Sequence, residues 1–181
     1  MSENFTLFLT ALGLFSVSLT GAYNIASHVA DGVPAHLNIT IAPFVQIGDG
    51  YYLIEQKVLK TWYQAYLECR KLGADLVSFE TRKEMEAVHA HPSITGERLQ
   101  FWTSGTDLAK QGEHVWFANS KPLSKDFWYP GEPNNSGGNE RCVTLWYKFK
   151  DSPGLNDLPC ERLHRYICEA PTPKTASFVI W

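Results

Sequence analysis

A group of oxygen-bearing side chains with close spacing stands in the second half of the chain. Glu132-Pro133-Asn134 is followed by Glu140 and then by Asn156-Asp157. These three carboxylates and two amides are hard oxygen donors, and Ca²⁺ takes six to eight such ligands in a flexible geometry. Soft metals prefer thiolate and imidazole ligands, so the set fits them less well. The sequence therefore predicts a calcium site that leaves coordination positions for a ligand, formed by Glu132, Asn134, Glu140, Asn156 and Asp157.

Four cysteines form an even set that favours disulfides, although four thiols can also stay reduced or bind metal. Because no Cys-x-x-Cys pair occurs, a zinc site has little support. The order of the predicted elements favours pairing Cys69 with Cys168 and Cys142 with Cys160, one of three possible pairings. The second bridge would hold both ends of the segment 143–159 beside the oxygen ligands.

The N-terminal residues indicate the compartment. Residues 5–19 are apolar or small and uncharged, and small residues precede a cleavage position after Ala22. We therefore expect residues 1–22 to be a signal peptide and the mature protein to be secreted and extracellular, where disulfides are the default. A short membrane anchor is the alternative, but a run of about fifteen residues is short for a span of roughly 20. Asn38 begins an Asn-Ile-Thr sequon and is the expected glycosylation site.

The elements that would position these groups follow from local signals. Residues 51–54 are β-prone, and Thr61 with Gln64 forms a capping box for a helix that ends near Gly73. Thr81 with Glu84 predicts a second capping box and a helix to about residue 90. Residues 103–140 are rich in Gly, Asn, Pro and Ser, which predicts long functional loops. Closing strands are expected at 143–147 and 166–168, so the fold class is α+β.

The flanks of this domain carry weaker signals. Residues 23–43 lack periodicity and are interpreted as an N-terminal extension, so the domain is expected to span 44–170. Residues 171–181 form a C-terminal tail for which fraying is the default and an oligomer contact is the alternative.

Composition limits the function classes. The chain has 181 residues, and 16 Lys plus Arg against 19 Asp plus Glu give a net charge of -3, which argues against nucleic acid as a partner. Aromatic residues make up 13%, and Trp62, Trp102, Trp116 and Trp146 are expected in the core. Trp128 and Tyr129, beside Glu132, are the better candidates for flanking a ligand.

In order and spacing, the oxygen ligands and the four cysteines resemble a C-type lectin carbohydrate-recognition domain over about residues 44–171. The resemblance implies two helices, antiparallel sheets, a long calcium-binding loop region and two disulfides. It also implies that Glu132, Asn134, Glu140, Asn156 and Asp157 ligate Ca²⁺, that two sugar hydroxyls complete the shell, and that the Glu132-Pro133 bond is cis. Secreted single-domain insect lectins have a similar layout.

The Glu-Pro-Asn tripeptide resembles the type that prefers mannose, fucose or N-acetylglucosamine, with galactose as the alternative. The implied partners are glycans on microbial or host surfaces, as in innate recognition, with no membrane span after signal removal and with an oligomer as an option. Asn135 and Gln111 stand where many relatives carry carboxylates of an auxiliary calcium site. This leaves Asp107 and Glu140, and we expect that second ion to be weak or absent.

Three alternatives stay open at the level of sequence. Glu132 and Glu140 could serve a glycoside hydrolase as acid and nucleophile, although the interleaved Asn residues count against it. The same fold could form a calcium-independent protein-binding module. The five ligands could also be ordinary solvated loop residues. Asn134-Asn135-Ser136 is itself a sequon, and we expect Asn134 to stay unmodified, because a glycan there would abolish coordination.

Overall fold

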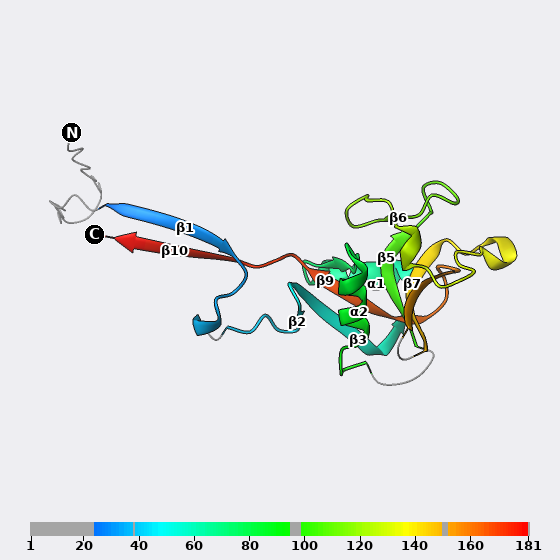
Figure 1. Ribbon diagram of the computed structural model, residues 1–181, viewed down its shortest axis with the longest axis horizontal. Coiled ribbons are helices and arrows are strands. Elements are labelled where there is room, and N and C mark those ends of the chain that lie inside the picture. The colour runs from blue at the N-terminus through cyan, green and yellow to red at the C-terminus, as the bar shows by residue number, and fades with distance from the viewer. Residues whose placement is uncertain (1–23, 38, 95–98, 150–151, 181) are drawn as a thin grey trace, which may run out of the picture. The chain divides into compact units, whose positions relative to one another are not determined.

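Figure 1 shows the computed structural model, which describes residues 24–37, 39–94, 99–149 and 152–180. The expected signal peptide, residues 1–22, and the expected glycosylation site at Asn38 lie outside these residues. The chain divides into two units, one of residues 40–172 and one that joins the described residues up to 39 with those from 173 onward.

The larger unit is built on one mixed β-sheet. In the described part of the chain its strand order is β2-β3-β9-β5-β7-β8, with β4 beside β9 and β6 beside β5. Neighbouring strands are antiparallel except β5 and β9, which run parallel and pair Phe101 with Arg165. The strands are β2 (Val45–Ile47), β3 (Gly50–Lys60), β4 (Asp75–Leu76), β5 (Gln100–Thr106), β6 (Val115–Trp116), β7 (Cys142–Phe149), β8 (Ser152–Leu158) and β9 (His164–Ala170).

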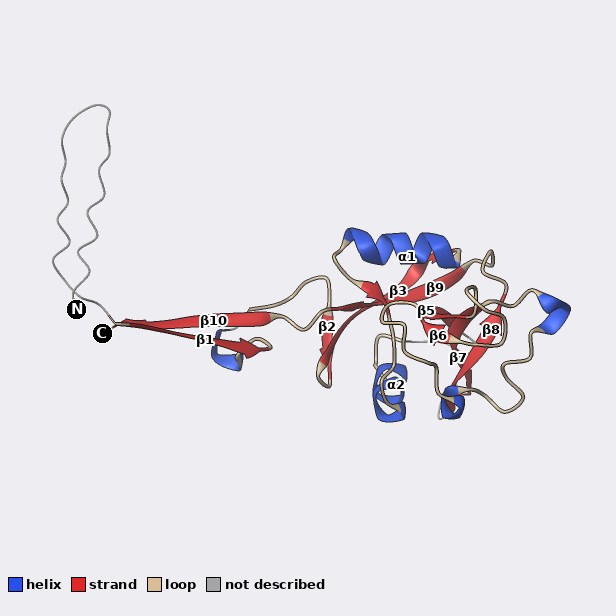
Figure 2. Cartoon of the chain, turned by 90° about the horizontal axis from the view of Figure 1, so that it is seen from above, coloured by secondary structure: helices blue, strands red, loops and turns tan. Residues whose placement is uncertain are grey.

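Two helices flank this sheet, and Figure 2 shows α1 and α2 on either side of the strands. Helix α1 (Trp62–Lys71) has the predicted capping box, because Thr61 Oγ1 accepts from Gln64 N and the Gln64 side chain accepts from Thr61 N. It ends before Gly73, whose φ of 69° favours glycine. The predicted α+β class is confirmed, with two helices and a sheet that is mixed.

Helix α2 (Arg82–His89) departs from the predicted capping box. Thr81 Oγ1 accepts from Glu84 N as expected, at 3.1 Å. The Glu84 carboxylate, however, accepts from the Tyr52 hydroxyl at 2.7 Å and from Glu80 N at 2.8 Å. A contact from strand β3 therefore replaces the expected bond to the Thr81 backbone, and tertiary packing overrides the local motif.

The core consists of two groups of buried side chains. One lies around Phe79, Phe101 and Trp116, and the other lies around Trp62, Trp102 and the four cysteines. Trp62, Trp102 and Trp116 are buried as predicted, whereas Trp146 is half-buried, with its ring centroid 5.3 Å from that of Tyr129.

Both predicted disulfides are present. Cys69 bonds Cys168 across 99 residues, and Cys142 bonds Cys160 across 18 residues. The first ties α1 to β9. The second joins the start of β7 to the residues that follow β8, so the strand that carries Asn156 and Asp157 is fixed near its end.

The smaller unit is a two-stranded antiparallel sheet, in which β1 (Ile25–Asp31) pairs with β10 (Lys174–Ile180). We expected these segments to be an irregular extension and a frayed tail, and this expectation is wrong for both strands. Their backbone groups satisfy one another, and Gly32 N also donates to Pro173 O at 2.7 Å.

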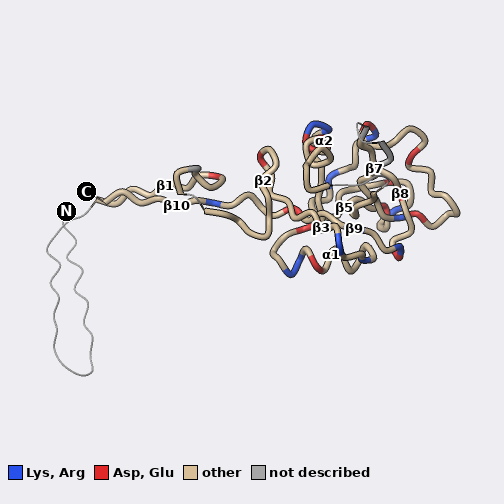
Figure 3. Tube along the Cα trace, turned by 90° about the horizontal axis from the view of Figure 1, so that it is seen from below, with Lys and Arg blue, Asp and Glu red and all other residues tan. Residues whose placement is uncertain are grey.

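Charged residues are interleaved over residues 40–172 and sparse along the β1–β10 sheet, as Figure 3 shows. No helix among the described residues is both long and apolar enough to cross a membrane.

Candidate functional site

The tripeptide Glu132-Pro133-Asn134 lies in the loop between two short 3-10 helices, η2 (Lys125–Phe127) and η3 (Ser136–Gly138). The Glu132-Pro133 bond is cis, as predicted. Tyr129 N donates to Leu155 O at 3.1 Å, and Glu132 N donates to Tyr129 O at 2.9 Å. These bonds attach the loop to β8, so the tripeptide is held beside the strand that carries the other predicted ligands.

Asp157 holds this loop in place through hydrogen bonds to its backbone. It lies on β8 opposite Val143 of β7 and is fully buried. Its Oδ1 accepts from Asn134 N at 3.1 Å, and its Oδ2 accepts from Asn135 N at 2.8 Å. Two backbone N–H groups thus fix the orientation of the carboxylate and place Asn134 directly beside it.

Glu140 approaches from the other end of the same loop and is only 7% exposed. Its Oε2 accepts from Ser136 N at 2.8 Å, and Ser136 N also donates to Asn134 Oδ1 at 2.8 Å. Glu140 N in turn donates to Asn135 Oδ1 at 3.1 Å. The side chains of Asn134 and Glu140 therefore share one backbone donor, which brings their oxygens together.

Glu132 is the least satisfied member of the group. Its Oε2 is buried and has no hydrogen-bond partner among the described residues. Burial, followed by the negative charge of Asp157, a hydrogen bond with it and the charge of Glu140, raises the pKa of Glu132 to about 7, opposed by a hydrogen bond from the Asn134 backbone N–H. Burial also raises the pKa of Glu140, opposed by its bond from Ser136. Three carboxylates thus influence one another, and one of their oxygens, Oε2 of Glu132, has no donor among the described residues.

Asn156 is the predicted ligand whose side chain the structure does not connect to the others. Its backbone carbonyl accepts from Thr144 Oγ1 at 3.3 Å, and the residue is 7% exposed. Asn156 directly precedes Asp157 on β8, and this covalent neighbourhood is its connection to the other predicted ligands. The structure therefore links Glu132, Asn134, Glu140 and Asp157 by hydrogen bonds and charge, and Asn156 by sequence position.

The donor set fits a hard divalent cation. Within the described ranges, no three His, Cys, Asp or Glu side chains lie at metal-site spacing. The carboxylates are nevertheless near enough for Asp157 and Glu140 to raise the pKa of Glu132. Amide oxygens such as that of Asn134 would have to complete the shell, which matches the coordination preferred by Ca²⁺. The unpartnered Glu132 oxygen is the atom that such an ion would satisfy.

The two aromatic residues beside the tripeptide differ in their surroundings. Trp128 is half-buried, with its ring centroid 4.8 Å from that of His114 at an angle of 74°. Tyr129 is 6% exposed, and its hydroxyl donates to Trp146 O at 3.0 Å. Tyr129 therefore supports the loop from inside, and Trp128 is the better placed of the two to meet a ligand.

Sequence reasoning missed Arg141, which follows Glu140. Its guanidinium donates from Nε to Asp107 Oδ1 and from Nη2 to Asp107 O, and Asp107 is 3% exposed. Asp107 Oδ2 also accepts from Gly112 N at 2.6 Å. Arg141 thus supplies the positive charge beside Asp107, the residue in which we placed one charge of an auxiliary calcium site. A basic residue directly between a ligand and a cysteine is the signal that could have indicated this role.

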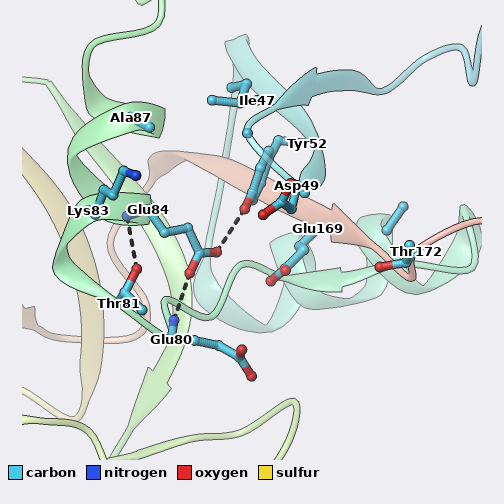
Figure 4. A pocket seen from close by; sticks show the side chains of 13 residues that line it. Ile47, Asp49, Tyr52, Glu80, Thr81, Lys83, Glu84, Ala87, Glu169 and Thr172 are labelled. Carbon is cyan, nitrogen blue, oxygen red and sulfur yellow. Dashed lines mark hydrogen bonds between the residues drawn. The ribbon is translucent and has the colours of Figure 1, made fainter. Parts of the chain in front are cut away.

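A second group of carboxylates lines a cavity of about 410 Å³ among β2, β3, α2 and β9, shown in Figure 4. Tyr52 donates to Glu84, and Ser78 N donates to Glu169 Oε2 at 3.1 Å. Burial, opposed by the Ser78 bond and supported by the charges of Glu84, Glu80 and Asp75, raises the pKa of Glu169 to about 7. No local signal in the sequence points to this cavity, because its residues come from segments far apart in the chain.

The fold, the two disulfides and the loop with the Glu132-Pro133-Asn134 tripeptide together define the class of C-type lectin-like carbohydrate-recognition domains. The chain belongs to the family of the Lectin C-type domain, whose model matches residues 58–170. C-type lectin 37Da of Drosophila melanogaster is 41% identical over 161 residues, which cover 86% of this chain and 86% of the relative. Salivary C-type lectin 2 of Aedes albopictus is 35% identical over 115 residues, which cover 60% of this chain and 76% of the relative.

A solved structure supports the same assignment. The cow C-type carbohydrate-recognition domain of CD23, determined in the presence of a GlcNAc2Man3 oligosaccharide, superposes with a TM-score of 0.63 and 27% identity. The superposition covers 75% of this chain and 98% of that chain. The predicted family and fold are confirmed. Members of this family bind carbohydrate without enzymatic activity, so the hydrolase alternative loses its support.

Proposed function

We propose that this protein is a secreted, calcium-dependent lectin of the Glu-Pro-Asn type that binds mannose, fucose or N-acetylglucosamine on microbial or host glycans. Glu132, Asn134, Glu140, Asn156 and Asp157 would hold one Ca²⁺. Vicinal hydroxyls of the sugar would complete the coordination shell. The family supports carbohydrate binding in general, the unpartnered oxygen of Glu132 supports the cation, and the resemblance of the Glu-Pro-Asn tripeptide supports the sugar preference.

The observation that carries the proposal is the buried, unpartnered Oε2 of Glu132 beside Asp157 and Glu140. A buried carboxylate oxygen without a donor is costly unless a cation or ligand satisfies it. A divalent cation would bring the pKa of Glu132 down and offset the repulsion among three acids. Its charge is what the loop lacks.

The choice of side chains also suits sugar hydroxyls. Each hydroxyl can coordinate the ion through its oxygen, donate to a carboxylate and accept from an amide N–H. Glu132 can only accept, whereas the exposed Asn134 has an amide nitrogen that can donate. Since the Asn134 oxygen accepts from Ser136 N, the amide is already oriented, which favours this pairing of roles.

Affinity chromatography tests the proposal directly. Purified protein is passed over mannose-agarose and galactose-agarose in the presence of Ca²⁺ and is then eluted with a chelator. We expect retention on mannose and release by the chelator. Retention on galactose alone would replace mannose by galactose, and retention that ignores the chelator would favour the calcium-independent module instead.

Acid should release the sugar as well. Ligand carboxylates must be ionised to bind the metal, so affinity for Ca²⁺ falls as pH drops. Because the pKa of Glu132 without a cation is about 7, the loss should begin in mildly acidic buffer and be complete by about pH 4. Full retention at that pH would contradict the mechanism.

Secretion and processing are part of the same proposal. The two disulfides and the salivary lectin among the relatives support an oxidising, extracellular location. Expression in insect cells should place the protein in the medium with Tyr23 as its first residue. Intact mass should show one glycan, at Asn38, and none at Asn134. Retention inside the cell with the first 22 residues intact would contradict this part.

A further inference from the structure

The two-stranded sheet of β1 and β10, which is called the hairpin although the two strands are not consecutive in the chain, has two chemically different faces. In an antiparallel pair, residues directly opposite each other lie on the same face, and successive residues alternate between faces. One face therefore holds the pairs Ile25 with Ile180, Ser27 with Phe178, Val29 with Ala176, and Asp31 with Lys174. The other face holds Ala26, His28, Ala30, Thr175, Ser177 and Val179. Most of the large apolar side chains gather on the first face, called the apolar face below.

This apolar face is open to solvent in the single chain. Ile25 is 66% exposed, Val29 is 62%, Phe178 is 67% and Ile180 is 62%. An isolated two-stranded hairpin is marginal in water and needs further strands or a packed partner for stability. A well-formed register with one exposed apolar face is the pattern of a sheet that packs against another surface.

We propose that the apolar face of the β1–β10 hairpin packs against the same face of a second copy of this chain. A twofold axis along the strand direction places β1 over the partner's β10, as in a closed, self-complementary dimer. In that arrangement Ser27 meets the partner's Phe178, and Val29 meets the partner's Ala176. Small residues face large ones at these two positions, and Ile25 meets the partner's Ile180 at the apolar end, so the two sheets can interdigitate and also bury a large apolar pair.

Charge complementarity selects this orientation. Asp31 and Lys174 form an ion pair at one end of the apolar face and are 69% and 64% exposed. With the axis along the strands, Asp31 lies over the partner's Lys174, and the four charges alternate in sign. An axis across the strands would instead place Asp31 over the partner's Ile25, against an apolar side chain. The charged end therefore specifies a parallel dimer.

The expected dimer is small and depends on concentration. Each hairpin has seven residue pairs. At about 3.4 Å per residue it is about 24 Å long and only two strands wide, so the area that it can bury is smaller than the roughly 800 Å² per partner of a standard interface. The Asp31–Lys174 end is the one that continues along the chain into residues 40–172 of each copy. Two lectin domains joined in this way would bind a glycan surface with a shared effective concentration.

Sedimentation equilibrium of the full secreted chain, measured without sugar, tests the proposal. We expect a monomer–dimer equilibrium in the wild type and dimerisation weakened at least about tenfold by Phe178→Lys. Val179→Lys is the matched control, because Val179 is the next residue, is 60% exposed and lies on the opposite face. The control should dimerise like the wild type.

A mixing experiment tests the orientation. Asp31→Lys and Lys174→Asp each place like charges within one hairpin, and each variant alone should dimerise about fivefold more weakly. When the two variants are mixed, the new positive charge at position 31 of one chain would lie over the new negative charge at position 174 of the other. A heterodimer should therefore form preferentially. A role confined to the single hairpin would give no such recovery.

The inference would be overturned by a wild type that stays monomeric at all concentrations, by equal disruption by Phe178→Lys and Val179→Lys, or by no gain on mixing. A monomer that instead binds lipid vesicles through Phe178 would also overturn it. The measurement needs neither calcium nor sugar. Its failure therefore leaves the proposed lectin activity untouched, and loss of that activity leaves the dimer intact.

Discussion

Two clusters of partly buried carboxylates in the same domain differ in the hydrogen-bond donors that their oxygens receive. In the cavity of Figure 4, Glu84 accepts from the Tyr52 hydroxyl and from Glu80 N, and Glu169 accepts from Ser78 N. In the candidate sugar site, Glu132 keeps a buried oxygen without a partner among the described residues. Both Glu132 and Glu169 have a pKa raised to about 7, and burial is the largest cause for each.

The difference lies in what the surrounding residues supply. Around Glu84 and Glu169 the chain provides its own donors, and the cluster holds α2 against β3 and β9. Around Glu132 the N–H groups of Asn134 and Asn135 donate to Asp157, and although the Asn134 N–H also lowers the pKa of Glu132, Oε2 of Glu132 keeps no partner among the described residues. A raised pKa therefore does not distinguish the two clusters, whereas the unpartnered buried oxygen of Glu132 does.

The largest expected effect comes from exchanging Glu for Gln in each cluster. Glu132→Gln should abolish calcium-dependent retention on mannose, a loss of at least about a hundredfold in affinity, because one charged ligand disappears. Without calcium the same change should not lower stability, since it removes a poorly satisfied charge. Column retention and thermal unfolding in chelator measure the two effects.

Glu84→Gln is the control for that comparison and should give the opposite pattern. It weakens the bond from Tyr52 and lowers stability, while sugar retention persists. Equal loss of retention in both variants would show that the two clusters do not differ in function.

Next in size is the effect of Arg141, which follows Glu140 in the chain but is outside the proposed ligand set. Arg141→Met leaves the buried Asp107 carboxylate without its cation and frees the residue that follows Glu140. Residues that orient metal ligands typically contribute about 10–100-fold to metal affinity, so Ca²⁺ should bind that much more weakly. A calcium titration measures it.

Lys121→Met provides the matched change, because Lys121 pairs with Glu80 on the surface at 2.7 Å, away from the sugar site. Its calcium affinity should equal that of the wild type. If Arg141→Met also left the affinity unchanged, Arg141 would have no positioning role.

A smaller effect concerns pH and the other cluster. The pKa of Glu169 is about 7 in the folded chain and near 4.5 when unfolded, so the folded state binds the proton more tightly. The free energy of unfolding is therefore highest below about pH 4.5 and falls as pH rises to about 7. Glu169→Gln should remove about 2 kcal/mol of this fall.

Urea unfolding of wild type and variant at pH 5 and pH 8 checks the sign. Comparing the two proteins cancels the contribution of Glu132, which both share. A variant with the same pH dependence as the wild type would mean that Glu169 titrates normally.

The smallest expected effect comes from removing the Tyr52 hydroxyl. Tyr52→Phe removes the hydroxyl that donates to Glu84 and should cost about 1 kcal/mol of stability. Tyr51→Phe is the control, because Tyr51 is the preceding residue and is also buried. Chemical denaturation should separate the two, and sugar retention should be equal in both.

Much of the fold could be predicted because its signals are local or few. Thr61 and Gln64 specify the start of α1 within four residues, and four cysteines allow only three pairings. The candidate ligands of the loop could be grouped from the sequence because Glu132, Asn134 and Glu140 are close along the chain. The hydrogen bonds from Asn134 N and Asn135 N to Asp157 depend on β8 returning beside this loop, and the second disulfide fixes the chain just after β8.

What could not be predicted depends on partners that are distant in sequence. Arg141 meets Asp107 across 34 residues, and Tyr52 takes Glu84 away from the Thr81 capping box across 32 residues. The β1–β10 hairpin joins the two ends of the described chain, and neither strand carries a turn signal that points to the other. Local patterns do not report such pairings, since they arise only when the chain closes on itself.

The pairing of β3 with β9 has a consequence for how this domain can be reused. Tyr51 is the register partner of Ala170, so the entry and exit of the lectin unit lie side by side. Such a module can be spliced into a surface turn of an unrelated scaffold without stretching the host backbone. Grafting residues 44–171 into a loop would therefore transplant glycan recognition as a cassette, with both cystine bridges enclosed in the insert.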